Sequence, residues 1–168
     1  MESGRRSHTE ATSSVLIAPC GMDCRLCRAY VRERKPCPGC RKNDGPKSKA
    51  CVTCSIKNCR KLAGQGLSFC FGCDEFPCVR LEHLDMRYRA KYGMSVIENL
   101  LDIKSVGIRK FVTTENEKWR CLHCREILCV HKPRCPTCGK TWRQVNEHAR
   151  IHLSPQRRSC IDCRRQAP

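Results

Sequence analysis

Apolar side chains recur at helical spacing along residues 79–117, a stretch that contains no cysteine. Ser95 and Glu98 have the spacing of a capping box ahead of a second apolar run, and Gly107 predicts a stop or a break before residues 108–112. The apolar positions of the first helix lie three or four residues apart, at Leu81, Leu84, Tyr88 and Tyr92. The pattern therefore predicts two helices, whose apolar faces either clip two modules together or bind a protein partner.

The sequence on either side lacks this periodicity. We predict a disordered tail at residues 1–14 and an N-terminal cysteine-rich zinc-binding module at residues 15–78. After the helices, we predict a C-terminal zinc ribbon or finger at residues 118–153 and a basic tail with one C-x-x-C pair at residues 154–168. Several prolines and glycines interrupt any long element of the first module: Pro36, Pro38, Gly39, Gly45 and Pro46. We expect a small metal-stabilised α+β protein, in which cysteine-rich zinc knuckles or ribbons are joined by a two-helix connector.

Cysteine usage favours metal over disulfides. Fourteen of the eighteen cysteines form seven C-x-x-C pairs, and each pair offers half of a tetrahedral zinc site. The start of the chain is polar, and the apolar run of residues 15–18 is too short for a signal segment or a membrane span. We therefore expect a cytoplasmic protein with reduced thiols and no membrane partner. Aromatic residues make up only 5% of the chain, so metal must replace part of the hydrophobic core.

The N-terminal thiols allow more than one assignment. The simplest first site takes Cys24, Cys27, Cys37 and Cys40, with Cys20 spare or substituting. A second site would take Cys54, Cys59, Cys70 and Cys73, which leaves Cys51 and Cys78 unassigned. Eleven thiols are one short of three full sites, so His83, a shared thiolate or free cysteines must account for the difference. The candidate ligands here are Cys20, Cys24, Cys27, Cys37, Cys40, Cys54, Cys59, Cys70, Cys73 and Cys78.

The C-terminal thiols allow two partitions. In the first, a zinc ribbon uses two C-x-x-C pairs: Cys121, Cys124, Cys135 and Cys138. In the second, one site closes with Cys121, Cys124, Cys129 and His131, and another with Cys135, Cys138, His148 and His152. The last two histidines are one helical turn apart, so they would share one face of a helix. Both partitions, with the N-terminal sites, give about three to four zinc ions per chain.

Several strings also resemble known families. Five strings carry the first resemblance: IAPCGMDCRLCRAY at residues 17–30, CPGC at 37–40, FCFGCDEFPC at 69–78, YRAKYGMS at 88–95 and WRCLHC at 119–124. Over about residues 17–140 the chain thereby resembles a prokaryotic cysteine-rich family catalogued as a domain of unknown function. That resemblance implies a cytoplasmic zinc-binding protein with no reaction attached. The short spacer between Cys138 and His148 is similar to the Ros-type zinc-finger regulators of bacteria. By that resemblance, Lys140, Arg143 and Gln144 would contact DNA.

The net charge of the chain and the absence of catalytic motifs restrict the class of function that we expect. The formal net charge is +17, and it stays positive after the negative charge of thiolate sites is counted. A polyanion such as DNA or RNA is therefore the expected partner. No Ser/His/Asp or HExxH arrangement is present, so we expect neither an enzyme nor a small-molecule substrate. The leading hypothesis is a nucleic-acid-binding or interaction module, and the alternative is a redox or metal sensor that carries an iron–sulfur cluster or labile zinc.

Overall fold

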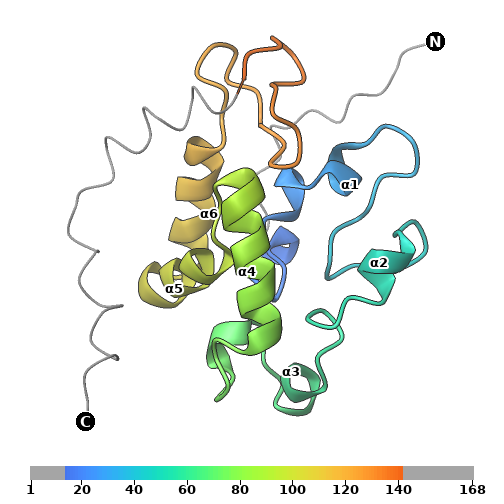
Figure 1. Ribbon diagram of the computed structural model, residues 1–168, viewed down its shortest axis with the longest axis vertical. Helices are drawn as coiled ribbons and strands as arrows, with labels where there is room; N and C mark the ends of the chain where they lie inside the picture. The colour runs from blue at the N-terminus through green and yellow to red at the C-terminus, as the bar shows by residue number, and fades with distance from the viewer. Residues whose placement is uncertain (1–13, 142–168) are drawn as a thin grey trace.

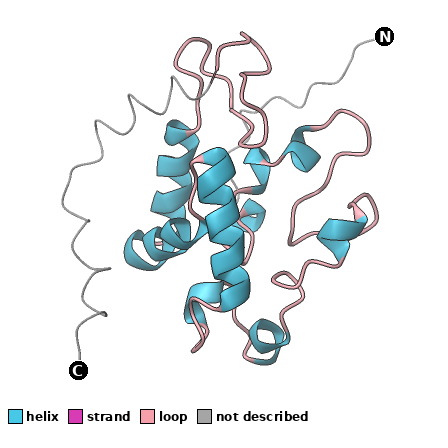
Figure 2. Cartoon of the chain, viewed as in Figure 1, coloured by secondary structure: helices cyan, strands magenta, loops and turns pink. Residues whose placement is uncertain are grey.

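The computed structural model describes residues 14–141, and they form helices joined by loops (Figures 1 and 2). The predicted tails, apart from Ser14, lie outside the described residues. The short helices are η1 (Ser14–Leu16), η2 (Cys24–Leu26), α1 (Arg28–Val31), α2 (Lys49–Val52), α3 (Arg60–Gly64) and η3 (Cys70–Gly72), and the long ones are α4 (Val79–Tyr92), α5 (Val96–Val106) and α6 (Ile108–Lys118). In Figure 1 the long helices lie together on one side, with α1, α2 and α3 on the other.

The helical segment contains three helices, so the predicted two-helix connector is wrong in number. The predicted N-cap of α5 is confirmed, because the Ser95 hydroxyl accepts the backbone N–H of Glu98 at 3.0 Å. Gly107, with φ of 79°, ends α5 and directly precedes α6. The break at this glycine is therefore followed by a full helix rather than by a short extension.

The predicted β component is not found in residues 14–141. Only isolated bridges occur there: Ile17 with Asp23, Arg120 with Ile127, and Arg134 with Thr141. Each bridge closes a tight turn that contains cysteine, and none extends into a ladder of strands. The described part of the protein is therefore small, cysteine-rich and mostly helical.

One hydrophobic core runs through all three predicted segments. Leu81 of α4 and Leu100 of α5 are buried with Leu26 of the N-terminal region and with Leu128 and Trp119 near the C-terminal hairpin. A second cluster joins Ile17 to α5 and α6 through Ile103, Phe111 and Val112. The long helices thus form the centre of the packing, and the cysteine-rich loops lie against them. None of the helices in the described range is long and apolar enough to cross a membrane.

The first cysteine turn is fixed against α5 by a close backbone approach. A Cβ atom at Gly21 would lie 2.8 Å from the carbonyl oxygen of Val96, so only glycine fits there, with its φ of 82°. The Asn99 side-chain amide donates to the Gly21 carbonyl oxygen at 3.0 Å, and this bond is buried. This contact sets the position of Cys20 and Cys24, which flank the turn.

A buried ion pair holds the same turn to α6. Arg25 and Asp23 are 6% and 0% exposed, and Nη2 of Arg25 lies 2.6 Å from Oδ2 of Asp23. The guanidinium also donates to Oδ1 of Asn116 at 3.0 Å. Because both charges are paired and hydrogen-bonded, the turn can be buried between the helices.

Candidate metal centre

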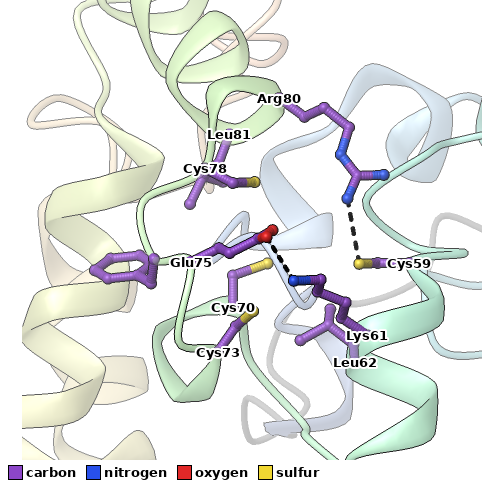
Figure 3. Close-up of a pocket in the computed structure, with 10 residues that line it drawn as sticks. Cys59, Lys61, Leu62, Cys70, Cys73, Glu75, Cys78, Arg80 and Leu81 are labelled. Atoms are coloured by element: carbon purple, nitrogen blue, oxygen red, sulfur yellow. Dashed lines mark hydrogen bonds and ion pairs between the residues drawn. The ribbon is translucent and has the colours of Figure 1, made fainter.

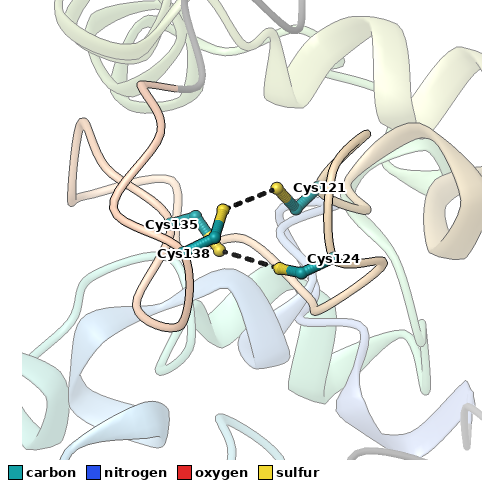
Figure 4. A group of neighbouring side chains, drawn as sticks. All are labelled: Cys121, Cys124, Cys135 and Cys138. Atoms are coloured by element: carbon teal, nitrogen blue, oxygen red, sulfur yellow. Dashed lines mark hydrogen bonds between the residues drawn. The ribbon is translucent and has the colours of Figure 1, made fainter.

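Four cysteine sulfur atoms meet in the hairpin of residues 119–141, which we call the ribbon segment. The sulfur atoms lie within 4.8 Å of one another, and Figure 4 shows the first pair facing the second. The Sγ atoms of Cys121 and Cys138 are 3.4 Å apart, and those of Cys124 and Cys135 are 3.5 Å apart. A tetrahedral site with Zn–S bonds of about 2.3 Å separates its sulfur atoms by roughly 3.8 Å. These four thiols, which we call the tetrad, could therefore hold a metal ion.

Two similar backbone turns present the tetrad. In the first, the Cys121 N–H donates to the carbonyl oxygen of Glu126, and the Arg125 N–H donates back to the Cys121 carbonyl oxygen, both at 2.8 Å. The second turn repeats both bonds with Cys135, Gly139 and Lys140 in the equivalent places. Each turn includes one left-handed residue, Arg125 with φ of 61° and Gly139 with φ of 71°. The repeated geometry aims both cysteine pairs at one point.

Backbone N–H groups favour the ionised form of Cys121, the first thiol of the tetrad. Burial acts to raise the pKa of Cys121, but N–H groups of Cys124 and His123 and the Cys138 thiol bond to its sulfur and bring the pKa down to about 7. The N–H of Lys140 also acts to lower the pKa of Cys138, but burial and hydrogen bonds to Cys121 and Cys135 outweigh it, so that pKa is raised. Burial and hydrogen bonds to neighbouring thiols likewise raise the pKa of Cys124 to about 12. Thiolates are the form that binds metal, so the first turn favours coordination at Cys121, and metal binding would displace the protons of the neighbouring thiols.

The structure brings together the four thiols of the plain ribbon partition. Among residues 14–141, no other group of His, Cys, Asp or Glu ligand atoms meets the same 4.8 Å spacing. The remaining candidates of the finger partition, His148 and His152, lie outside the described residues, as do Arg143 and Gln144. Lys140 is exposed beside the tetrad.

Cys129 and His131 lie apart from the tetrad, against the N-terminal region. The Val130 N–H donates to the Leu26 carbonyl oxygen at 2.9 Å. Nδ1 of His131 accepts the Arg28 N–H at 3.4 Å, and its Nε2 is 3.0 Å from the Tyr88 hydroxyl. Both ring nitrogens of His131 therefore have protein partners, and this residue joins the ribbon segment to α1 and α4. No short-range sequence signal could have found this link.

The contacts of the N-terminal thiols differ from the predicted first site, because its members have different neighbouring thiols. The Cys40 N–H donates to Sγ of Cys24 at 3.3 Å, and a hydrogen bond to Cys40, together with burial, raises the pKa of Cys24. Burial raises the pKa of Cys20 to about 12, and nearby thiols that include Cys40 add to the increase. Cys24 and Cys40 thus lie together with Cys20.

Cys27, the other half of the same C-x-x-C pair, faces a different group. Burial raises its pKa, and the neighbouring thiols that contribute are Cys51 and Cys129. Cys37 is 6% exposed, and its N–H donates to the Ala29 carbonyl oxygen at 2.8 Å. The two members of one C-x-x-C pair therefore do not share a neighbourhood here.

Four of the remaining candidates line one pocket, and Cys54 lies outside it. Cys59, Cys70, Cys73 and Cys78 line one pocket, shown in Figure 3. Cys54 does not line this pocket, and its thiol, like that of Cys70, contributes to the raised pKa of Cys20. None of the sixteen cysteines in residues 14–141 is in a disulfide.

The N-terminal region matches a known family. Residues 16–83 match the family described as protein of unknown function (DUF3795). The predicted resemblance to a cysteine-rich domain of unknown function is therefore confirmed over this range. The match ends at residue 83, well before the expected residue 140, so the tetrad lies beyond it. No curated protein and no solved structure matches the chain.

Proposed function

We propose that the protein is a non-enzymatic, multi-zinc module that binds nucleic acid. Thiolate–zinc sites hold the cysteine-rich loops in place, and exposed Lys and Arg side chains contact phosphates. The observation that carries the proposal is the tetrad inside a strongly basic hairpin. Its four thiolates would fill a zinc coordination sphere, which is the closed form typical of a structural site.

The charge of the ribbon segment supports a phosphate partner. Residues 119–141 contain five Lys or Arg and a single Glu. Binding of zinc to four thiolates adds a net charge of about −2, so the segment remains positive. Most of the cations are exposed: Arg125, Lys132, Arg134 and Lys140. Because these side chains extend from turns that the metal would hold rigid, they are suited to positioning contacts with a phosphate backbone.

Salt-dependent binding of the zinc-loaded full chain to fluorescent DNA and RNA duplexes tests the proposal. Each phosphate contact contributes about −0.9 to the slope of log affinity against log salt. We expect a quadruple Ala variant of the four exposed ribbon cations to bind more weakly and to reduce the magnitude of that slope by about 3.6 if each cation makes one phosphate contact. A matched control removes four exposed cations of the long helices: Arg87, Lys91, Lys104 and Lys110. Equal losses in both variants, or binding without salt dependence, would contradict the proposal.

A second candidate function, redox or metal sensing, is favoured by the neighbouring thiols Cys24 and Cys40. A hydrogen bond from Cys24 and the nearby ammonium groups of Lys47 and Lys57 lower the pKa of Cys40 to about 7, against the effect of burial. A thiol with that pKa is substantially ionised at neutral pH and reacts readily with oxidants and soft metals. Iron, acid-labile sulfide and a brown colour after anaerobic purification would support this function, whereas colourless zinc protein would not.

A further inference from the structure

A pocket between α3, η3 and the start of α4 is lined by four cysteines from these three segments. Its lining includes Cys59, Cys70, Cys73 and Cys78, which we call the pocket thiols. Figure 3 shows Cys70, Cys73 and Cys78 along one side and Cys59 on the other. The four thiols share this lining, although their sulfur atoms are spread more widely than those of the tetrad.

Helix boundaries fix the backbone at every pocket thiol. Cys59 directly precedes α3, and its carbonyl oxygen accepts the Ala63 N–H of that helix at 3.1 Å. Cys70 begins η3 and Cys73 is its C-cap, with the Cys73 N–H donating to the Cys70 carbonyl oxygen at 3.1 Å. Cys78 is the N-cap of α4. Because the backbones are held, rotation about χ1 is the movement needed to bring the sulfur atoms onto one ion.

Two cations line the pocket beside the sulfur atoms. Nη2 of Arg80 donates to Sγ of Cys59 at 3.5 Å, and Lys61 pairs with the Glu75 carboxylate at 2.5 Å across the mouth. Four thiolates around a divalent ion carry a net charge of about −2. Arg80 therefore supplies both a hydrogen bond to a sulfur ligand and part of the compensating charge. The apolar part of the lining includes the buried side chains of Leu62 and Leu81.

We propose that the pocket thiols form a second metal centre, which binds one soft divalent cation such as Zn²⁺ and is supported by Arg80. Binding displaces the thiol protons to solvent and leaves four sulfur–metal bonds. This assignment uses Cys78 where the sequence spacing favoured Cys54. It is independent of the proposed nucleic-acid binding, because metal is measured without nucleic acid.

Metal content combined with peptide-level alkylation of the full zinc-loaded chain tests this centre. We expect Cys78→Ser to lose one zinc per chain and to leave Cys59, Cys70 and Cys73 open to iodoacetamide, while the tetrad stays protected. Cys51→Ser is the matched control, because Cys51 is also partly buried and was also left over by the sequence partition, but it does not line the pocket. In this control the pocket thiols should stay protected.

The wild-type protein gives a test that does not depend on a variant folding. During stepwise zinc removal with a chelator, the pocket thiols should become reactive together, as one equivalent of zinc is released. Arg80→Gln should weaken zinc binding at this centre about 10- to 100-fold, which is usual for a lost outer partner of a ligand, and Lys104→Gln should not. Unchanged zinc and continued protection in Cys78→Ser would overturn the proposal. Equal reactivity of the pocket thiols with and without chelator in the wild-type protein would do so too.

Discussion

The ribbon segment and the N-terminal region use the same C-x-x-C turn with different results. In the ribbon segment both cysteines of each pair point at one centre, and all four sulfur atoms lie within 4.8 Å. In the N-terminal region one pair is divided, because Cys24 lies with Cys40 and Cys20 while Cys27 lies near Cys51 and Cys129. A C-x-x-C spacing therefore identifies metal ligands without showing which of them share a metal.

The difference follows from how far apart in sequence the fixing contacts are. The ribbon turns are closed by backbone bonds between residues four or five positions apart. The turn around Gly21 is held instead by Asn99 and by close approach to Val96 of α5. Local bonds can be inferred from spacing, but contacts with a distant helix depend on the packing of the whole chain. The comparison predicts that the two regions depend on metal and on the helices to different degrees.

Chelation should have the largest effect, and should act on the ribbon segment most strongly. Structural zinc contributes about 10–16 kcal/mol of binding energy in small peptides at neutral pH, and the ribbon segment shows only isolated bridges besides its turns. We expect amide hydrogen exchange in residues 119–141 to lose its protection after zinc removal, whereas amides of α5 keep most of theirs. Returning zinc should restore the protection. Full protection of the ribbon amides in metal-free protein would contradict the prediction that this segment depends on metal more than α5 does.

Trp119 tests whether the two regions unfold together. Its side chain is 1% exposed and its Nε1–H donates to Oε2 of Glu115 at 2.8 Å, while its carbonyl oxygen accepts the Leu128 N–H at 2.8 Å. Trp119→Ala should cost about 3–5 kcal/mol, as for other large core truncations, measured by urea unfolding with saturating zinc. Trp119→Phe should cost less because more of the volume remains. A loss in Trp119→Ala under about 1 kcal/mol would show that the ribbon segment is held independently of this residue.

The helical part of the fold could be predicted from sequence where the signals were local. Ser95 with Glu98 correctly predicted the start of α5, and Gly107 its end. The third long helix was missed because residues 108–118 carry few apolar side chains, and Phe111 and Val112 are buried in a cluster with Ile17 and Ile103. The strands of the predicted α+β class are not found in residues 14–141, because single bridges close the cysteine turns.

The candidate site shows the same limit. Spacing predicted the tetrad as one of two partitions, and it could not exclude Cys129 or His131 as ligands. Only the contacts of His131 with Arg28 and Tyr88, which are distant in sequence, separate it from the tetrad. The pocket thiols likewise depend on the start of α4 lying beside α3, and no spacing rule specifies that contact.

Asp85 provides a test of the helical core without cysteine. Its carboxylate accepts the Ile97 N–H at 3.0 Å and the Ser95 hydroxyl at 2.7 Å, and it pairs with Arg89. Asp85→Asn should cost about 1–3 kcal/mol in thermal or urea unfolding, because a buried charge-assisted network is lost. Asp102→Asn, on the exposed face of α5, is the matched control and should change stability little. Equal stability of the two variants would contradict the role of Asp85.

The same carboxylate should make stability depend on acid. Burial opposes ionisation of Asp85, but bonds from Ile97, Ser95 and Arg89 outweigh it and lower the pKa below the ordinary value of 3.8. The folded state therefore favours the ionised form. Its contribution is complete above pH 3.8 and is lost as pH falls below that value. The Asn variant should lack this component of acid unfolding.

His131 tests the contact between the two regions through pH. Burial, and then the Arg28 charge, lower the pKa of His131 below 6.5, so the folded state favours the neutral ring. The contact contributes fully above pH 6.5 and weakens as pH falls below it. His131→Gln should cost about 1 kcal/mol at neutral pH and show a shallower loss on acidification than the wild-type protein. His123→Gln, exposed on the same hairpin, should retain the wild-type slope, and an identical slope in all three proteins would contradict this role.

The smallest effect concerns the left-handed residues that close the two ribbon turns. Arg125 and Gly139 occupy equivalent places with φ of 61° and 71°, and only the second turn has glycine there. A non-glycine residue in this conformation costs about 1–2 kcal/mol, while glycine loses about 0.5–1 kcal/mol more than alanine through its unfolded-state freedom. Arg125→Gly should therefore stabilise the zinc-loaded protein slightly, by less than about 1 kcal/mol. Gly139→Ala should destabilise it by a comparable amount, since a Cβ there meets no atom within 4 Å and backbone strain alone acts. Differential scanning calorimetry of both variants measures the two shifts in melting temperature. Shifts of the same sign would show that the two turns are not equivalent.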